Sequence, residues 1–334
     1  MLGVVTHSFR ATCGIYDMQG KNPNPLGPIE LMHKLKAMGS QGIMFISTEG
    51  HIPNLDEGLL GEVGEEAKSL GMYLEGGSSG TEPVETERQL RATAIMGGKI
   101  LKTSVGWLLH PDIISNTDEW NTFKKETRTN LKVLAKMARY WDIKIGLENH
   151  FDVTYQELAQ FVDEVGSEYI GVTLDTANAF GIVQDPVETA RALAPYIIAT
   201  HFKDWQLYET RNGYTMRQDV LGQGEVDLKT IVPIIQAANP DVNYSIELDH
   251  HRNFEMKVLD PAYWNSFEKR DPNDLVKMLN ITRKANRPIE KLKDVPYLKG
   301  ASIEELMEHE TKILQKSMDY CVKELGFEIG KENK

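Results

Sequence analysis

IKIGLENH, residues 143–150, is the first of four stretches that decide the fold, and it is followed by YIGVTLDT (169–176), IIATHFKD (197–204) and NYSIELDH (243–250). Each is a short run rich in β-branched and apolar residues, which predicts a strand covered on both faces. Longer segments at helical spacing separate them. After the first stretch, the predicted helix face carries Leu158, Phe161, Val162 and Val165. This alternation is typical of repeated βα units around a parallel sheet.

The first half of the chain repeats the pattern in LGVVTHSF (2–9), GIMFIST (42–48), MYLEGG (72–77) and KILKTSV (99–105). Eight parallel strands in succession indicate closure, so we expect the α/β class and a (β/α)8 TIM barrel with a C-terminal helical extension. A chain of 334 residues with 41% apolar content has room for one barrel of about 250 residues and such an extension. We place the metal-binding barrel at 1–254 and the extension at 255–334.

Two segments depart from the repeat. Between the last two strands, Asn212 and Gly213 flanked by alternating residues predict a β-hairpin, and Gly222 and Gly224 shape a loop before the next helix. The tail has one clear helix, from Ile303 to Leu325, which we expect to pack on the barrel or on a partner subunit.

Composition excludes several classes of function. The formal net charge of -12 and the lack of a basic cluster argue against nucleic acid as a partner. Cys13 and Cys321 are the only cysteines and have no C-x-x-C pairing, which argues against a disulfide framework and fits a cytoplasmic location. No leader-like N-terminus and no apolar stretch of membrane-spanning length is evident, so we expect a soluble protein without a membrane partner.

Acidic and imidazole side chains recur at the ends of the last four strands: Glu148, Asp175, His201 and Glu247. Each alone is equally well explained as an ordinary polar group at a strand end, but a barrel brings all four ends together. Three carboxylates in one place repel one another, and a bound cation removes that penalty while the imidazole adds a nitrogen ligand. Oxygen-rich ligation with one nitrogen favours one divalent ion, Mn²⁺ first and Mg²⁺ or Co²⁺ as alternatives.

Over residues 1 to 252 the chain resembles the xylose isomerase-like TIM barrel family, which includes sugar phosphate isomerases and ketose 3-epimerases. GLENH, TLDTAN, THFKD and the loop LGQGEVD carry the resemblance, in that order. It implies that the four residues are the metal ligands and that Glu148 and Glu247 flank the reacting carbon as catalytic groups. Many ketose epimerases have a histidine three residues after the metal-binding aspartate, where this chain has Asn178. The resemblance also implies association into a homo-oligomer.

Other polar residues near strand ends are candidates for the substrate pocket, although each is also explained as a solvated strand-end or loop side chain. They are His7, Glu75, Lys102, His150, Asn178, Lys203 and Arg217. If two or three of the cations face the metal, the substrate carries a carboxylate or a phosphate, because a neutral sugar does not need them. This favours a sugar acid.

The first hypothesis is a metal-dependent sugar isomerase or epimerase, in which a glutamate removes a proton next to a carbonyl and the metal stabilises the enediolate. The second is a metal-dependent decarboxylase or lyase that acts on a 3-oxo sugar acid or a 3-keto glycoside, suggested by Lys102, Lys203 and Asn178. A phosphodiesterase would need further metal ligands and a basic surface, and both are largely missing. A binding barrel without catalysis is disfavoured by the intact set of four ligands.

Overall fold

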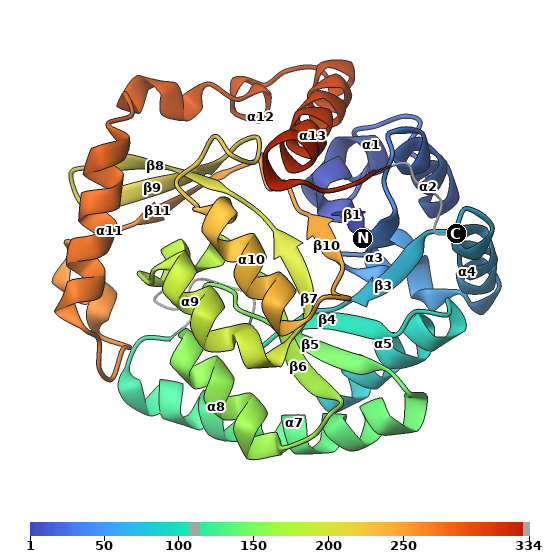
Figure 1. The fold of residues 1–334 in the computed structure, drawn as a ribbon, viewed down its shortest axis with the longest axis horizontal. Coiled ribbons are helices and arrows are strands. Elements are labelled where there is room, and N and C mark those ends of the chain that lie inside the picture. Colours follow the sequence, from blue (N-terminus) through green and yellow to red (C-terminus); the bar gives the residue numbers. More distant parts are fainter. Residues whose placement is uncertain (107–113, 330–334) are drawn as a thin grey trace.

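The computed structural model describes residues 1–106 and 114–329, and it contains the predicted barrel (Figure 1). Eight parallel strands close in the order β1-β10-β7-β6-β5-β4-β3-β2. They are β1 (Leu2–Val5), β2 (Gly42–Met44), β3 (Tyr73–Gly77), β4 (Ile100–Ser104), β5 (Lys144–Glu148), β6 (Ile170–Asp175), β7 (Ile197–Phe202) and β10 (Tyr244–Ile246). All eight lie inside the stretches predicted from the sequence, which confirms the fold class.

Helices surround the barrel (Figure 1). Their buried apolar side chains belong to the same core as those of the strands. The longer ones are α2 (Pro28–Ala37), α4 (Glu57–Ser69), α5 (Pro83–Ile95), α7 (Thr117–Trp141), α8 (Tyr155–Val165), α9 (Pro186–Leu193) and α10 (Leu228–Ala238). Leu158, Phe161 and Val162 of α8 are buried, whereas Val165 is half-buried. Thr154 caps α8 through a reciprocal pair of hydrogen bonds with Glu157, which fixes where the helix begins.

The insertion after β7 forms the predicted hairpin from β8 (Trp205–Thr210) and β9 (Gly213–Gln218). A third antiparallel strand that the sequence did not indicate, β11 (Asn253–Met256), pairs with β9. The loop after the hairpin is anchored by Asp204, whose carboxylate accepts hydrogen bonds from the backbone N–H groups of Gly222, Gly224 and Val226. A Cβ at position 224 would lie 2.1 Å from Asp204 Oδ1, so only glycine fits there.

The tail contains α11 (Pro272–Ala285), the short α12 (Pro296–Lys299) and α13 (Ile303–Leu325). The bounds of α13 agree with the helix predicted from the sequence. Ile313, Leu314 and Met318 of α13 are buried in the main core, where the helix lies beside α1 (Arg10–Cys13) and α10. The described part of the tail is therefore packed against the barrel.

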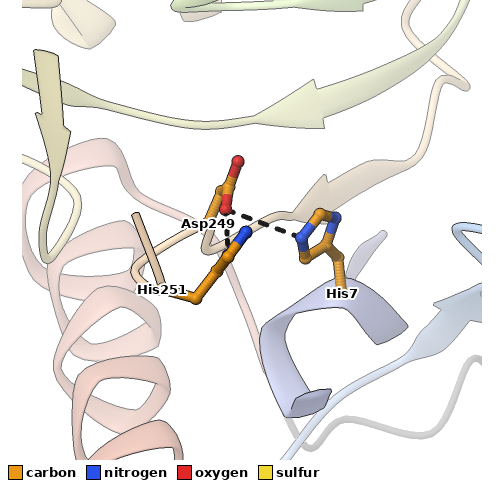
Figure 2. Close-up of side chains that lie close together, drawn as sticks. All are labelled: His7, Asp249 and His251. Carbon is orange, nitrogen blue, oxygen red and sulfur yellow. Dashed lines mark ion pairs between the residues drawn. The ribbon is translucent and has the colours of Figure 1, made fainter. Parts of the chain in front are cut away.

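β1 and β10 are neighbours in the barrel, so the segments that leave them meet at the same edge. The 3-10 helix η1 (Thr6–Phe9) follows β1 directly and carries His7. Figure 2 shows His7 beside Asp249 and His251, which follow β10. This edge borders the cluster of acidic residues described next.

Candidate metal centre

The four predicted ligands meet at the C-terminal end of the barrel. Glu148 ends β5, Asp175 ends β6, His201 lies in β7 and Glu247 follows β10. Each offers one donor atom, and these atoms all lie within 4.8 Å of one another. None of the four side chains is more than 3% exposed. Barrel closure therefore brings together groups that are as far as 99 positions apart in the sequence.

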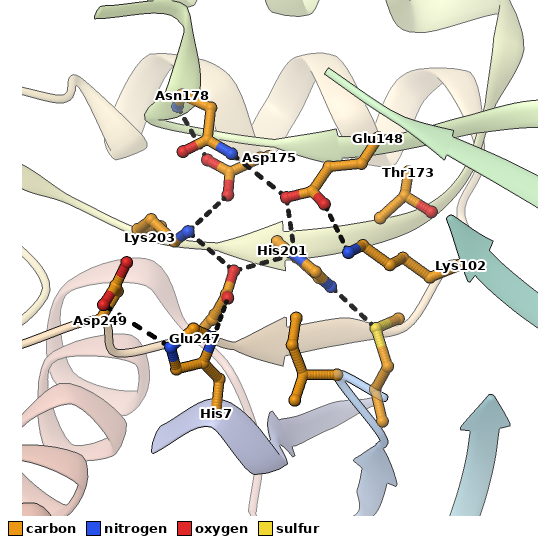
Figure 3. Close-up of polar contacts among 12 residues, drawn as sticks. His7, Lys102, Glu148, Thr173, Asp175, Asn178, His201, Lys203, Glu247 and Asp249 are labelled. Atoms are coloured by element: carbon orange, nitrogen blue, oxygen red, sulfur yellow. Dashed lines mark hydrogen bonds and ion pairs between the residues drawn. The ribbon is translucent and has the colours of Figure 1, made fainter. Parts of the chain in front are cut away.

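His201 is the centre of the cluster (Figure 3). Its Nδ1 lies 3.0 Å from Glu148 Oε1 and 2.9 Å from Glu247 Oε2, so the same nitrogen faces both glutamates. On the other side of the ring, Nε2 lies 2.9 Å from the sulfur of Met44. The acids, and not the thioether, define the polar face of this imidazole.

Asp175 is held by its own turn. Its Oδ1 accepts hydrogen bonds from the backbone N–H groups of Ala177 and Asn178, each at 2.8 Å. The side chain of Asn149 accepts from the backbone N–H of Asp175 at 2.8 Å and donates to its carbonyl at 2.9 Å. These contacts leave Oδ2 of Asp175 facing the cluster.

Two lysines enter the cluster and are almost completely buried (Figure 3). Lys102 Nζ from β4 lies 2.7 Å from Glu148 Oε2. Lys203 Nζ lies 2.8 Å from Glu247 Oε2 and 3.1 Å from Asp175 Oδ2. Each glutamate therefore has its own lysine partner.

The charges decide how the acids titrate. Burial raises the pKa of Glu148, but the charges of Lys102 and His201 outweigh it and hold the pKa below its usual range. Glu247 follows the same pattern, with Lys203 and His201 lowering its pKa. For Asp175 burial dominates and raises the pKa to about 6, although Lys203 opposes it. For His201 burial lowers the pKa, but Glu247 and Glu148 outweigh burial and raise it to about 9.

The donor set fits a divalent cation. Oε2 of Glu148, Oδ2 of Asp175 and Oε2 of Glu247 are buried, and none has a partner in hydrogen-bond geometry. Their nearest cations are the ammonium groups of Lys102 and Lys203, which form ion pairs with them. Three buried carboxylates and one imidazole nitrogen within a few ångströms match the oxygen-rich sites of Mg²⁺ and Mn²⁺.

Five of the seven residues predicted for the substrate pocket lie at or near this cluster. Asn178 donates from Nδ2 to Glu148 Oε1 at 3.1 Å, and His7 Nδ1 lies 3.3 Å from Glu247 Oε1. Burial lowers the pKa of His150 to about 4, and the charge of Glu148 acts on it in the opposite direction. Lys102 and Lys203 are the other two.

Glu75 and Arg217 are not brought to the cluster. Glu75 accepts a hydrogen bond from Asn243 Nδ2 at 2.9 Å near the N-terminal end of the barrel. It is the third residue of β3, two residues before the strand ends, so its side chain does not reach the C-terminal end. Arg217 stays within the hairpin region, where it donates to Gln206 at 2.6 Å, to Asp219 and to the carbonyl of Lys291. Its β-sheet partners hold it away from the acids.

Sequence reasoning missed three residues at the edge of the site: Arg10, Asp249 and His251. Asp249 and His251 belong to the segment LDHH directly after Glu247, and this run of polar residues next to a predicted ligand was a usable signal. Arg10 had no such signal, because no local pattern in the sequence shows that the segment after β1 brings it to His251.

Among residues 1–106 and 114–329, no helix is long and apolar enough to cross a membrane.

Comparison with known proteins gives the family. The model of the xylose isomerase-like TIM barrel family matches residues 32–266, and the chain belongs to this family. A curated relative is the 3-oxo-isoapionate decarboxylase of Pectobacterium atrosepticum, 21% identical over 248 residues, which covers 74% of this chain and 84% of the relative.

Solved structures of similar fold include sugar epimerases. The D-psicose 3-epimerase of Clostridium cellulolyticum H10 has a TM-score of 0.58 and 14% identity, and the match covers 86% of this chain and 99% of the epimerase. A xylose isomerase-like TIM barrel protein from Mycobacterium smegmatis in complex with magnesium has a TM-score of 0.55 and 14% identity, with 86% and 97% covered. At these identities the likeness concerns the fold.

Proposed function

We propose that this chain is a divalent-metal-dependent enzyme that cleaves carbon dioxide from a 3-oxo sugar acid. The observation that carries the proposal is the pair of buried lysines, Lys102 and Lys203, on the two glutamates of the cluster. Burying two ammonium groups costs several kcal/mol unless they have anionic partners. Lys102 and Lys203 would exchange their glutamate partners for a substrate carboxylate if the glutamates held a divalent ion.

A divalent ion held by Glu148, Asp175, His201 and Glu247 would polarise the substrate's carbonyl and stabilise the negative charge that its oxygen gains. The lysines would bind and orient the substrate carboxylate. When the bond between this carboxylate and the adjacent carbon breaks, carbon dioxide leaves and the electron pair moves towards the carbonyl. Lys203 or Lys102 would then donate a proton to the same carbon, which completes the exchange of carboxylate for hydrogen.

The choice of decarboxylation reverses the order favoured by sequence alone. A lysine ammonium lies beside each of the two glutamates, and such cations suit a substrate carboxylate, which a neutral sugar lacks. Loss of carbon dioxide needs no base. The decarboxylase among the relatives supports the same class of reaction.

Epimerisation or isomerisation of a sugar is the second candidate, because Glu148 and Glu247 approach His201 Nδ1 from two sides at 3.0 and 2.9 Å. Two carboxylates on opposite sides of one centre are the arrangement that removal of a proton from one face and its return to the other face requires. The epimerases of similar fold support this alternative.

The test uses protein loaded with Mg²⁺ in D₂O and a panel of ketoses, inososes and 3-oxo sugar acids, followed by proton NMR and by carbon dioxide release. Carbon dioxide release with one deuterium in the product supports the decarboxylase. Deuterium next to a carbonyl in an intact carbon skeleton favours the second candidate. Lys102→Met is expected to lose decarboxylation, and Lys99→Met, an exposed lysine one position before β4, is the matched control.

We also propose Mn²⁺ as the ion of the site, a metal-binding barrel of residues 1–254 followed by a helical extension at 255–334, self-association and a cytosolic location. The donor set supports the first and the two free, buried cysteines fit the last. Metal content of protein purified from cells and its mass in solution test the ion and the association.

A further inference from the structure

A second group of metal-type side chains lies beside the metal centre: His7, Asp249 and His251 (Figure 2). Their donor atoms approach within 4.8 Å, but Arg10 is already there. Its Nη1 lies 3.0 Å from His7 Nε2 and 2.8 Å from His251 Nε2. A guanidinium is always charged and carries donors only, so this place is taken by a cation from the chain itself.

The contacts of Arg10 determine where both imidazoles carry their hydrogen. Nη1 of Arg10 lies nearer to Nε2 of His251 than to Nδ1 of the same ring, at 2.8 against 3.3 Å. Because Nη1 donates, Nε2 of His7 and Nε2 of His251 accept, and each neutral ring then has its hydrogen on Nδ1. The Nδ1 of His251 is paired with Asp249 Oδ1, an acceptor, which agrees with this assignment. The Nδ1 of His7 lies 3.3 Å from Glu247 Oε1, which is also an acceptor.

We infer that Arg10 is a positioning residue for the metal centre: it holds His7 with its hydrogen on Nδ1, the ring nitrogen that lies 3.3 Å from Oε1 of Glu247. Oε2 of the same glutamate faces His201 and Lys203, on the side of the other donors. A partner that fixes the outer oxygen of a ligating carboxylate orients the inner one. The effect on metal binding rests on the proposed function, whereas the assignment of the hydrogens does not.

The tail of the chain holds Arg10 in place. Arg10 is the first residue of α1, and the backbone N–H groups of the next two residues, Ala11 and Thr12, donate to Glu310 of α13 at 2.7 and 3.0 Å. Glu310 is completely buried, so this link between tail and barrel is shielded from water. At its outer end, the guanidinium pairs with Asp17. The tail thereby reaches Glu247 through Arg10 and His7.

The experiment is nitrogen-15 NMR of histidine-labelled protein, without metal and with Mg²⁺, in which the shifts of the ring nitrogens identify the tautomer. Signals of His7 and His251 are assigned with His7→Gln and His251→Gln. In the native protein we expect both rings to carry hydrogen on Nδ1. In Arg10→Gln and Arg10→Lys, which are both made in case one fails to fold, we expect a mixture of tautomers at His7.

The same variants are titrated with Mn²⁺ by calorimetry, where we expect affinity to fall about 10- to 100-fold. Asp17→Asn is the matched control, because it removes the outer ion pair and leaves both imidazole contacts. Unchanged tautomers in the Arg10 variants, unchanged Mn²⁺ affinity despite altered tautomers, or an equal change in Asp17→Asn would overturn the inference. If the native protein binds no Mn²⁺, the proposed function fails, and the tautomers still decide the role of Arg10.

Discussion

The barrel buries carboxylates at both of its ends, and the carboxylates at the two ends have different neighbours. At the C-terminal end, Glu148 and Glu247 are surrounded by Lys102, Lys203 and His201. Nearer the N-terminal end, Glu75 has one neutral hydrogen-bond partner, the amide of Asn243, and its second oxygen has none. All three side chains are at most 3% exposed, so burial does not distinguish them.

The difference lies in the neighbouring charges. Burial raises the pKa of Glu75 to about 7, and Asn243 opposes this only in part. Lysine and histidine charges overcome the same burial for Glu247 and lower its pKa. A neutral acid at one end is compatible with simple packing. Burying the group of charges at the other end costs folding free energy. Such buried charges are typical of functional sites.

The packing around Glu75 supports this contrast. Tyr73, two residues before Glu75, reaches across the barrel interior and shares a hydrogen bond of 2.7 Å with Ser245. A Cβ at Gly42 would lie 2.1 Å from the ring of Tyr73, so the glycine makes room for the ring. At this end an aromatic ring and neutral hydrogen-bond partners surround the glutamate, whereas the other end collects ionisable groups.

Replacing the same residue type at both ends gives the largest expected contrast. Glu148→Gln should lower turnover about 10²- to 10³-fold, because it removes a ligand charge from the site that would stabilise the developing negative charge. Glu75→Gln should leave turnover unchanged. The measurement is the steady-state rate of the reaction identified above, together with metal content. Equal losses in both variants would contradict the assignment of chemistry to one end only.

Lys203→Met tests whether the lysines offset the acids. In metal-free protein the change leaves Asp175 and Glu247 buried without their cation, and we expect a loss of about 3–5 kcal/mol in the free energy of unfolding. Added Mg²⁺ should restore part of it, since a cation again neutralises the acids. Urea unfolding with chelator and with Mg²⁺ measures both. A loss that Mg²⁺ leaves untouched argues against a metal at this place.

Glu75→Gln should stabilise the protein above neutral pH. The pKa of Glu75 rises from 4.5 to about 7 on folding, so the folded state holds its proton more tightly and loses stability as pH rises through this range. The neutral amide avoids that loss, and the gain at pH 8 is at most about 3 kcal/mol. At pH 5 it should be much smaller. Urea unfolding at both pH values measures the gain in the free energy of unfolding. An equal gain at pH 5 and pH 8 would contradict a buried, titrating carboxyl.

The smallest effect is expected for an ion pair at the surface. Lys99 and Asp142 lie 2.6 Å apart and both are 71% exposed, so water and salt screen their attraction. Lys99→Met should leave the urea midpoint within error of the native value. A loss comparable with that of Lys203→Met would mean that burial is not what makes the inner pairs important.

Much of the site could be predicted because strand ends are visible in the sequence. GLENH, TLDT, THFKD and SIELD place one acid or imidazole each at the end of an apolar run, and barrel closure then brings them together. The position of Glu75 along the barrel could not be predicted, because a strand pattern shows which face a side chain is on but not how deep along the strand it lies. The contact that keeps Arg217 within the hairpin region could not be predicted either, because its partner Lys291 lies 74 positions away in the sequence.

Local periodicity and turn residues were enough to predict the class of fold, the eight strands, the hairpin after the seventh strand and the helix at 303–325. Which charges meet became visible in three dimensions and not before. The tertiary structure placed Lys102 and Lys203 on the two glutamates and Arg10 between His7 and His251, and it brought Glu310 of the tail to the start of α1. Such pairs depend on distances of a few ångströms between segments up to 299 positions apart, which no local pattern specifies.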